Sequence, residues 1–285
     1  MLNFDRNNLP FDKDVKNFWK TNGFVVIKNF YTDQECDALR DRANKLVSEF
    51  DPKSVQSVFD TNKQEHIDDR YFLESGEKIR FFFEDKAFDK KGNLIYEKKF
   101  VINKIGHALH DLDNEFYKFS HRKDLYDISK SIGIDNPLLI QSMYIFKQPN
   151  IGGEVVCHQD STFLYTKPDT VVGYWVALED ANIDNGCLWV AAGGHKGPLR
   201  KLFTWRDDKM KMVILDATPF EETTTPVEVK KGTLVLLHGR LPHYSKENTS
   251  SKSRHAYTLH VIDGNKYYPK ENWLQRPNLE LKGFV

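Results

Sequence analysis

The second half of the chain is a series of short β-rich segments separated by glycine, proline and asparagine. Glycine pairs such as Gly152-Gly153 and Gly193-Gly194 stand between the segments, where turns are expected. Short strands spaced in this way predict a sandwich or barrel with helices packed on its outside. The segments that follow Pro137 are 138–147, 170–178, 187–191, 233–237 and 256–262.

The first 136 residues are expected to be mainly helical. Residues 14–21 form an amphipathic helix that stops at Gly23, and 24–27 read as a buried strand. Thr32 and Glu35 form a capping box, in which each side chain satisfies a backbone donor, so a helix begins there. Apolar residues at helical spacing predict two more helices, at 104–119 and 123–132. The lysine-rich stretch 90–99 is interleaved with acids and predicts a solvated hairpin.

The charge balance limits the partners. The 285 residues include 41 Lys and Arg against 41 Asp and Glu, which argues against a nucleic-acid binder or a membrane-surface protein. No apolar run reaches the roughly 18 residues that span a bilayer. Neither a secretory signal nor a peroxisomal address is visible, and the three cysteines are too scattered for a disulfide framework. We therefore expect a cytoplasmic protein with a small-molecule substrate; the sequence indicates no oligomeric state.

His158 and Asp160 are the first candidates for chemistry. Side chains two residues apart on a strand point to the same side, so both can reach one metal ion while Gln159 points away. A second histidine from a distant strand would complete a triad of two histidines and one carboxylate. Such a triad holds non-haem Fe(II) and leaves open positions for a co-substrate and oxygen.

A later segment offers the missing histidine and a basic anchor. Arg254 follows His243 by eleven residues, and a guanidinium there could bind the far carboxylate of a dicarboxylic acid bidentately. His238 and His243 both remain candidates for the third ligand, because turn geometry does not choose between them.

Four stretches of the chain resemble a known family. They are 78–84 (KIRFFFE), 103–109 (NKIGHAL), 141–147 (QSMYIFK) and 271–275 (ENWLQ). With them the chain resembles, over nearly its whole length, the phytanoyl-CoA dioxygenase family of Fe(II)- and 2-oxoglutarate-dependent oxygenases. The resemblance implies a double-stranded β-helix, a jelly-roll or cupin-like barrel that is mainly β and buttressed by N-terminal helices. We expect a single domain over 1–285, with a mainly helical buttress (1–136), a barrel core with the metal site (137–265) and a C-terminal tail (266–285).

The resemblance also assigns roles to individual residues. It implies iron ligation by His158, Asp160 and His243, and a salt bridge from Arg254 to 2-oxoglutarate. Further 2-oxoglutarate contacts are implied at Lys104, Met143, Trp175 and Ser245. The implied cofactors are Fe(II), 2-oxoglutarate and O₂, with ascorbate as a candidate reductant.

The implied reaction is hydroxylation of a small molecule, acyl-CoA-like or other, with decarboxylation of 2-oxoglutarate to succinate and CO₂. A halogenase would replace the carboxylate of Asp160 with a small residue, and a zinc hydrolase would leave Arg254 without a role. A metal-binding sensor or scaffold of the same fold is the alternative from another class.

Overall fold

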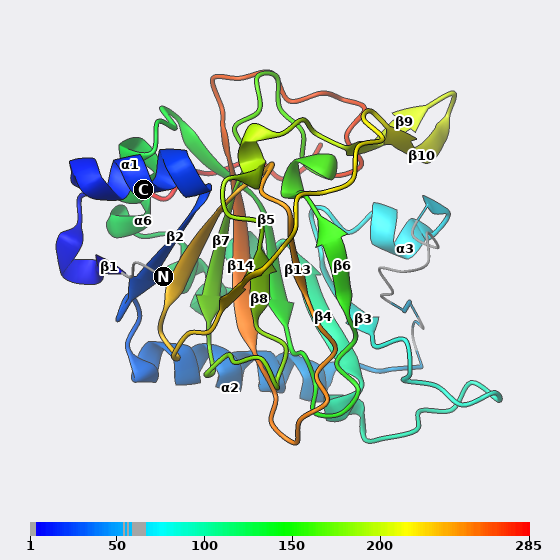
Figure 1. Cartoon of the computed structure of the whole chain (residues 1–285). Coiled ribbons are helices and arrows are strands. Elements are labelled where there is room, and N and C mark those ends of the chain that lie inside the picture. Colours follow the sequence, from blue (N-terminus) through cyan, green and yellow to red (C-terminus); the bar gives the residue numbers. More distant parts are fainter. Residues whose placement is uncertain (1–3, 54, 56, 59–66) are drawn as a thin grey trace.

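An eight-stranded sheet forms the centre of the computed structural model, which describes residues 4–53, 55, 57–58 and 67–285 (Figure 1). The two N-terminal strands of this sheet pair in parallel, and the other neighbours pair antiparallel. The central strands are nearly all apolar because both faces of the sheet are covered. In spatial order the strands are β1 (Phe4–Asp5), β2 (Phe24–Lys28), β12 (Leu234–His238), β7 (Val172–Ala177), β14 (Ala256–Asp263), β5 (Pro137–Ile145), β4 (Ile102–His107) and β3 (Ile79–Phe83).

Helices pack against the outer face of this sheet and form the largest core cluster with it. The capping box of Thr32 and Glu35 is present and begins α2, and Gly23 ends α1 in the left-handed conformation. No helix in the described part of the chain has the length and apolar character that crossing a bilayer requires. The helices are α1 (Lys13–Asn22), α2 (Asp33–Glu49), α3 (Arg70–Leu73), α4 (Leu109–Leu112), α5 (Asn114–Ser120) and α6 (Lys123–Ser131), with 3₁₀ turns at Arg6–Asn8, Lys98–Phe100, Asp160–Thr162 and Gly194–Lys196.

A smaller, four-stranded sheet lies against the inner face of the large one. Its strands, in spatial order, are β11 (Thr225–Val227), β8 (Leu188–Val190), β13 (His243–Ser245) and β6 (Val155–His158). Trp175 and Leu237 of the large sheet share a buried cluster with Leu188 and Val190 of the small one. Among the described residues the two sheets remain separate and do not close into a continuous barrel.

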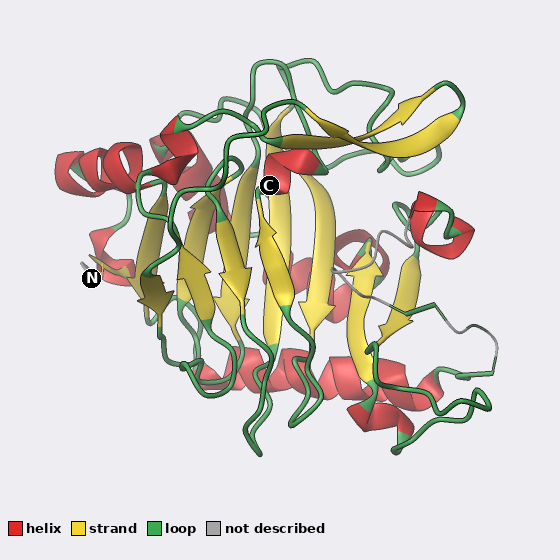
Figure 2. Cartoon of the chain, turned by 45° about the vertical axis from the view of Figure 1, so that its right-hand side comes forward, coloured by secondary structure: helices red, strands yellow, loops and turns green. Residues whose placement is uncertain are grey.

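A hairpin of β9 (Lys201–Arg206) and β10 (Lys209–Ile214) extends above the ends of the two sheets (Figure 2). The C-terminal tail is attached to it, because the Trp205 amide donates to the Glu271 carbonyl at 2.8 Å. Phe203 of the hairpin and Trp273 of the tail belong to one buried cluster. Hairpin and tail therefore form a roof over one end of the space between the sheets.

Two expectations from the sequence are wrong in detail. Residues 104–119 do not form one helix: strand β4 occupies 102–107, and its neighbours β3 and β5 pair with it on both sides. Asp113 then interrupts the remainder, because its side chain caps α5. The first 136 residues also supply four strands of the large sheet, so they are less helical than expected.

The candidate metal centre and its cavity

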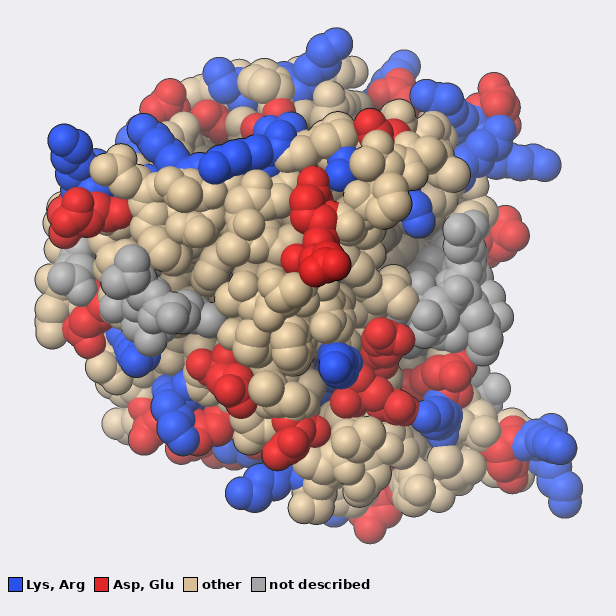
Figure 3. All heavy atoms as spheres, viewed as in Figure 1, with Lys and Arg blue, Asp and Glu red and all other residues tan. Residues whose placement is uncertain are grey.

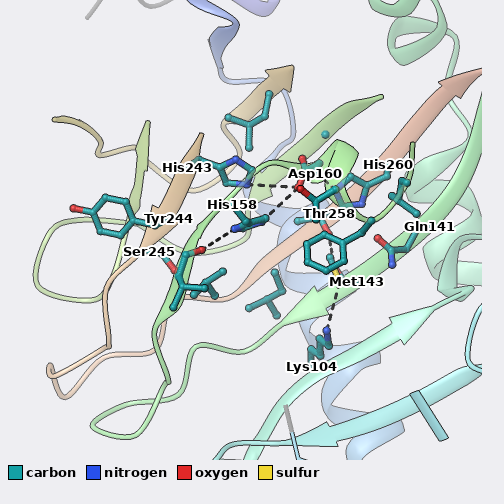
Figure 4. A pocket seen from close by; sticks show the side chains of 18 of the residues that line it. Lys104, Gln141, Met143, His158, Asp160, His243, Tyr244, Ser245, Thr258 and His260 are labelled. Carbon is teal, nitrogen blue, oxygen red and sulfur yellow. Dashed lines mark hydrogen bonds and ion pairs between the residues drawn. The ribbon is translucent and has the colours of Figure 1, made fainter. Parts of the chain in front are cut away.

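Two histidines and one aspartate converge at the edge where β6 and β13 pair. His158 ends β6 and His243 begins β13, and the two residues lie directly opposite each other in the ladder. Asp160 follows in the 3₁₀ turn Asp160–Thr162, and its Oδ1 lies 3.6 Å from the Nε2 of each histidine. Three atoms that could bind a metal therefore lie within 4.8 Å of one another (Figure 4).

The backbone orients both imidazoles. The Nδ1 of His158 lies 2.8 Å from the Val156 carbonyl, and that of His243 lies 2.9 Å from the Leu241 carbonyl. A carbonyl only accepts, so each Nδ1 carries the hydrogen and each Nε2 presents a lone pair to the cluster. Burial lowers the pKa of His243 to about 4, and a neutral ring is the form that binds a metal. The residues present thus fit a divalent cation.

Asp160 also contacts a third histidine, which the sequence did not mark as functional. The Nε2 of His260, on β14, lies 3.4 Å from Asp160 Oδ2. Burial alone would raise the pKa of Asp160, but the neighbouring histidines, His260 first, lower it well below its usual range. Gly173 leaves room for this carboxylate, since a Cβ there would lie 2.8 Å from Oδ2.

One prediction about this segment needs revision. Asp160 does not share a strand with His158, because β6 ends at His158 and the chain turns there. Gln159 does point away and bonds the carbonyls of Pro198 and Arg240. The other candidate ligand, His238, lies outside the cluster, with its ring against those of Trp19 and His195.

Arg254 lies just before β14 and lines the same cavity as the cluster. It is 2% exposed, its Nε donates to the Gly186 carbonyl at 3.0 Å, and its guanidinium lies over the Trp175 ring. Its Nη1 has no hydrogen-bond partner among the described residues, and burial lowers the pKa of Arg254 to about 10. A buried, incompletely bonded guanidinium favours an anionic ligand.

The other predicted contacts line this cavity too. Trp175 and Met143 pair with Thr258 from its two sides, so all three lie in one row across β7, β14 and β5. The Nζ of Lys104 lies 3.9 Å from the Met143 sulfur, and burial holds the pKa of Lys104 well below its ordinary value. Ser245 ends β13, and its Oγ accepts a hydrogen bond from Lys147 at 2.9 Å.

The cavity encloses about 290 Å³. One part of its wall is polar and holds the cluster, Arg254 and two buried residues that the sequence did not single out for function, Gln141 and Lys147. Gln141 lies opposite His260 in the β5–β14 ladder. The remaining wall, toward the hairpin and the tail, is mainly apolar. Besides Lys201 at the start of β9, it includes Phe72, Phe163, Leu164, Phe203, Met212, Phe220 and Trp273.

Comparison with known proteins identifies the family. The family model for phytanoyl-CoA dioxygenase (PhyH) matches residues 19–256. The chain belongs to the phytanoyl-CoA dioxygenase family. A phytanoyl-CoA dioxygenase of Arabidopsis thaliana is 45% identical over 268 residues, covering 93% of this chain and 94% of the relative. The phytanoyl-CoA dioxygenase domain-containing protein 1 of Danio rerio is 42% identical over 276 residues, covering 93% and 94%.

Solved structures share the fold of this family member. The non-haem α-ketoglutarate-dependent carbocyclase SnoK superposes with a TM-score of 0.63 at 16% identity, covering 95% of this chain and 90% of SnoK. EctD from S. alaskensis, solved with 2-oxoglutarate and 5-hydroxyectoine, gives 0.62 at 17% identity, covering 96% and 83%. The predicted family, its dioxygenase class and the double-stranded β-helix are thereby confirmed.

Proposed function

We propose that this dioxygenase binds Fe(II) and 2-oxoglutarate in the cavity and hydroxylates a small molecule there. One observation carries the proposal: the His-Asp-His cluster and the incompletely bonded guanidinium of Arg254 line a single buried cavity. The His-Asp-His cluster by itself could bind any divalent cation. A buried guanidinium in the same cavity supplies the anchor that an anionic co-substrate of the metal requires.

His158, Asp160 and His243 would hold the iron through two Nε2 atoms and one carboxylate oxygen. When bound, Fe(II) supplies the activation of O₂, for which the oxidation of 2-oxoglutarate to succinate and CO₂ provides two electrons. The hydrogen bonds at Nδ1 fix the ring orientations before a ligand arrives. The chain contributes a preorganised set of ligands.

The co-substrate would lie between the cluster and Arg254. The guanidinium would bind the distal carboxylate, and Ser245 would donate its hydroxyl hydrogen to the same group. Met143 and Trp175, which lie in one row with Thr258 on the large sheet, would line the co-substrate together with Lys104 of the neighbouring strand β4. Burial of this end excludes water, which strengthens each of these charged contacts.

The substrate would occupy the apolar part of the cavity, under the hairpin and the tail. Aromatic and aliphatic side chains there favour a small molecule with an apolar body. On the face seen in Figure 3, acidic and basic side chains are interspersed, so no broad basic surface covers that face. An acyl chain or another compact apolar group fits this chemistry.

Two variants test the proposal. Asp160→Ala should remove iron binding, because it deletes the anionic ligand, whereas Asp180→Ala, at an exposed acid paired with Lys230, should not. Arg254→Lys should weaken 2-oxoglutarate binding about tenfold or more, since an ammonium cannot make the bidentate contact. Iron content by elemental analysis and 2-oxoglutarate affinity by calorimetry measure both effects. Equal loss of iron and 2-oxoglutarate in Arg254→Lys would make Arg254 structural.

A further inference from the structure

We propose that Lys147 is a positioning residue for the co-substrate: its ammonium orients the Ser245 hydroxyl and adds a second positive charge beside Arg254, which selects a dicarboxylate. The proposal rests on the function proposed above. It concerns a residue that reaches the cavity from the loop after β5, far in sequence from both Ser245 and Arg254.

Lys147 is buried, and no carboxylate of the residues that the structure describes forms an ion pair with it. It is 1% exposed, and its Nζ donates to the Gly153 carbonyl at 2.6 Å and to Ser245 Oγ at 2.9 Å. Neither Lys147 nor Arg254 forms an ion pair within the described part of the chain. Burying a cation without an opposite charge is costly. A site with two such cations favours an anion between or beside them.

The contact with Lys147 decides what Ser245 can do. An ammonium only donates, so the Ser245 oxygen accepts from Lys147, and the single hydroxyl hydrogen stays available for another acceptor. Ser245 lines the cavity close to His158 and His243 (Figure 4). Lys147 thereby turns Ser245 into a donor, which is what a carboxylate oxygen needs.

Gly186 brings Lys147 and Arg254 together. The carbonyl of Gly186 accepts from Arg254 Nε, and a Cβ on Gly186 would lie 2.7 Å from Lys147 Cε. With φ of +82°, this position also favours glycine on conformational grounds. The Arg254 amide donates to the Lys147 carbonyl at 3.2 Å. The two cationic side chains thus flank one glycine at the same end of the cavity.

The backbone of Lys147 is held in an unusual conformation. Its φ is +42°, a region that side-chain-bearing residues rarely adopt. Its carbonyl accepts from the Asn248 amide group at 2.9 Å as well as from the Arg254 backbone. Strain that is over-determined in this way commonly marks a functional position. Here it points the side chain inward instead of letting the lysine reach solvent.

The nearest acids do not neutralise Lys147 by contact. Glu84 is buried, and its Oε2 accepts from the amide of Gly153, the same residue whose carbonyl accepts from Lys147. Burial, followed by repulsion from Arg254, lowers the pKa of Lys147 to about 7, while Glu84, Glu154 and Glu247 oppose this from a distance. A bound carboxylate would remove the repulsion.

The test compares two 2-oxo acids that chelate iron alike. 2-Oxoglutarate has a distal carboxylate, and 2-oxopentanoate has the same chain length without one. Dissociation constants are measured anaerobically on the Fe(II)-loaded full chain from the visible charge-transfer band. Lys147→Met should raise the dissociation constant of 2-oxoglutarate about tenfold or more, which is the effect of losing a charged hydrogen bond. The dissociation constant of 2-oxopentanoate should change by less than about twofold. Lys246→Met, at the exposed lysine next to Ser245, is the matched control and should change neither constant.

The two dissociation constants together show whether Lys147 acts on the distal carboxylate. Equal weakening of both acids, or of neither, would overturn the role of Lys147. In a Ser245→Ala background, Lys147→Met should reduce the affinity for 2-oxoglutarate clearly less than it does in the native chain, because the two residues act together. If Lys147→Met does not fold, Ser245→Ala alone must lower the preference for 2-oxoglutarate, and an unchanged preference would refute the proposal. A native chain that gives no band with either acid would instead contradict the proposed function.

Discussion

Three imidazole rings surround the carboxylate of Asp160. His158 and His243 face Oδ1, and His260 faces Oδ2 from the large sheet. Because His260 occupies Oδ2, the other carboxylate oxygen, Oδ1, faces the two histidines that are proposed to bind the metal, His158 and His243. A contact of this kind keeps a ligand in the orientation that a metal needs, and it adds affinity without touching the metal.

Removing this support should weaken iron binding. We expect His260→Leu to lower Fe(II) affinity about tenfold, because Asp160 loses the partner of Oδ2. Anaerobic calorimetry on the full chain measures the affinity. His121→Leu, on a half-buried helix end away from the cluster, serves as the control. An Fe(II) affinity in His260→Leu equal to that of the control would show that Asp160 is oriented without His260.

The third ligand is tested by a pair of alanine variants. His243→Ala should abolish iron binding, since the ring faces His158 and Asp160. His238→Ala should retain iron, because that ring lies against Trp19 and His195. Metal content after anaerobic reconstitution and gel filtration distinguishes them. The reverse pattern would place His238, and not His243, on the metal.

At the scale of elements, the cavity depends on strands that join the sheet from both halves of the chain. Lys104 comes from β4, Met143 from β5 and Trp175 from β7, and the ladders place these strands around β14. The roof depends on the C-terminal tail. Arg276 of the tail contacts the fully buried carboxylate of Asp111 in α4, and Lys282 lies 3.6 Å from it.

Breaking this anchor should loosen the roof. Asp111→Ala leaves the buried guanidinium of Arg276 unpaired, and we expect a loss of about 3 kcal/mol in the free energy of unfolding. Equilibrium urea denaturation measures it. Asp180→Ala removes an exposed ion pair with Lys230 and should cost less than about 1 kcal/mol. Similar losses in the two variants would mean that the tail is held by its apolar contacts alone.

Local patterns predicted the elements that local chemistry determines. The capping box at Thr32 and the left-handed Gly23 are read within a few residues, and both are present. Strand β4 is different, because pairing with β3 and β5 overrides the helical spacing of Ile105, Leu109 and Leu112. Leu112, which a single helix over 104–119 would place on the same face as Ile105 and Leu109, is 48% exposed.

The residues of the candidate site also fall into two groups: those that a local sequence pattern predicts and those that only the folded chain brings together. His158 and Asp160 were found through their spacing, although the chain leaves the strand between them. His260, Gln141 and Lys147 were missed as functional positions, because the register of β14 and the loop after β5 bring them to the cavity. No local motif encodes such contacts. Their chemistry is visible only when the sheets are assembled.

At the scale of the whole molecule, the balanced charges contrast with the cationic end of the cavity. Lys104, Lys147 and Arg254 all line a cavity whose other charged lining residues, within the described part of the chain, are Asp160 and Lys201. The chain has no formal net charge, but these side chains create a strong positive electrostatic field inside the cavity. This field favours a dianionic ligand, and it should depend on pH where one of the cations titrates.

The affinity for 2-oxoglutarate should fall as pH rises. The pKa of Lys147 is lowered to about 7 and that of Arg254 to about 10, so of these two cations Lys147 loses its charge between these values and Arg254 keeps its charge. Bound dianion favours the protonated lysine, so the dissociation constant should rise by up to about tenfold per pH unit above about pH 7. Calorimetry at saturating Fe(II) from pH 6.5 to 8.5 measures it. The Lys147→Met variant should bind 2-oxoglutarate weakly at every pH. A native affinity that depends on pH as little as that of the variant would contradict the proposed role of Lys147.

The most direct test of the central claim is an anaerobic spectrum followed by oxygen. Fe(II) and then 2-oxoglutarate are added to the purified chain, and the weak visible charge-transfer band of the chelate is recorded. We predict that the band develops, is absent in Asp160→Ala, and fades on admission of oxygen with formation of succinate. Iron binding without any band would contradict the claim that cluster and Arg254 serve one co-substrate.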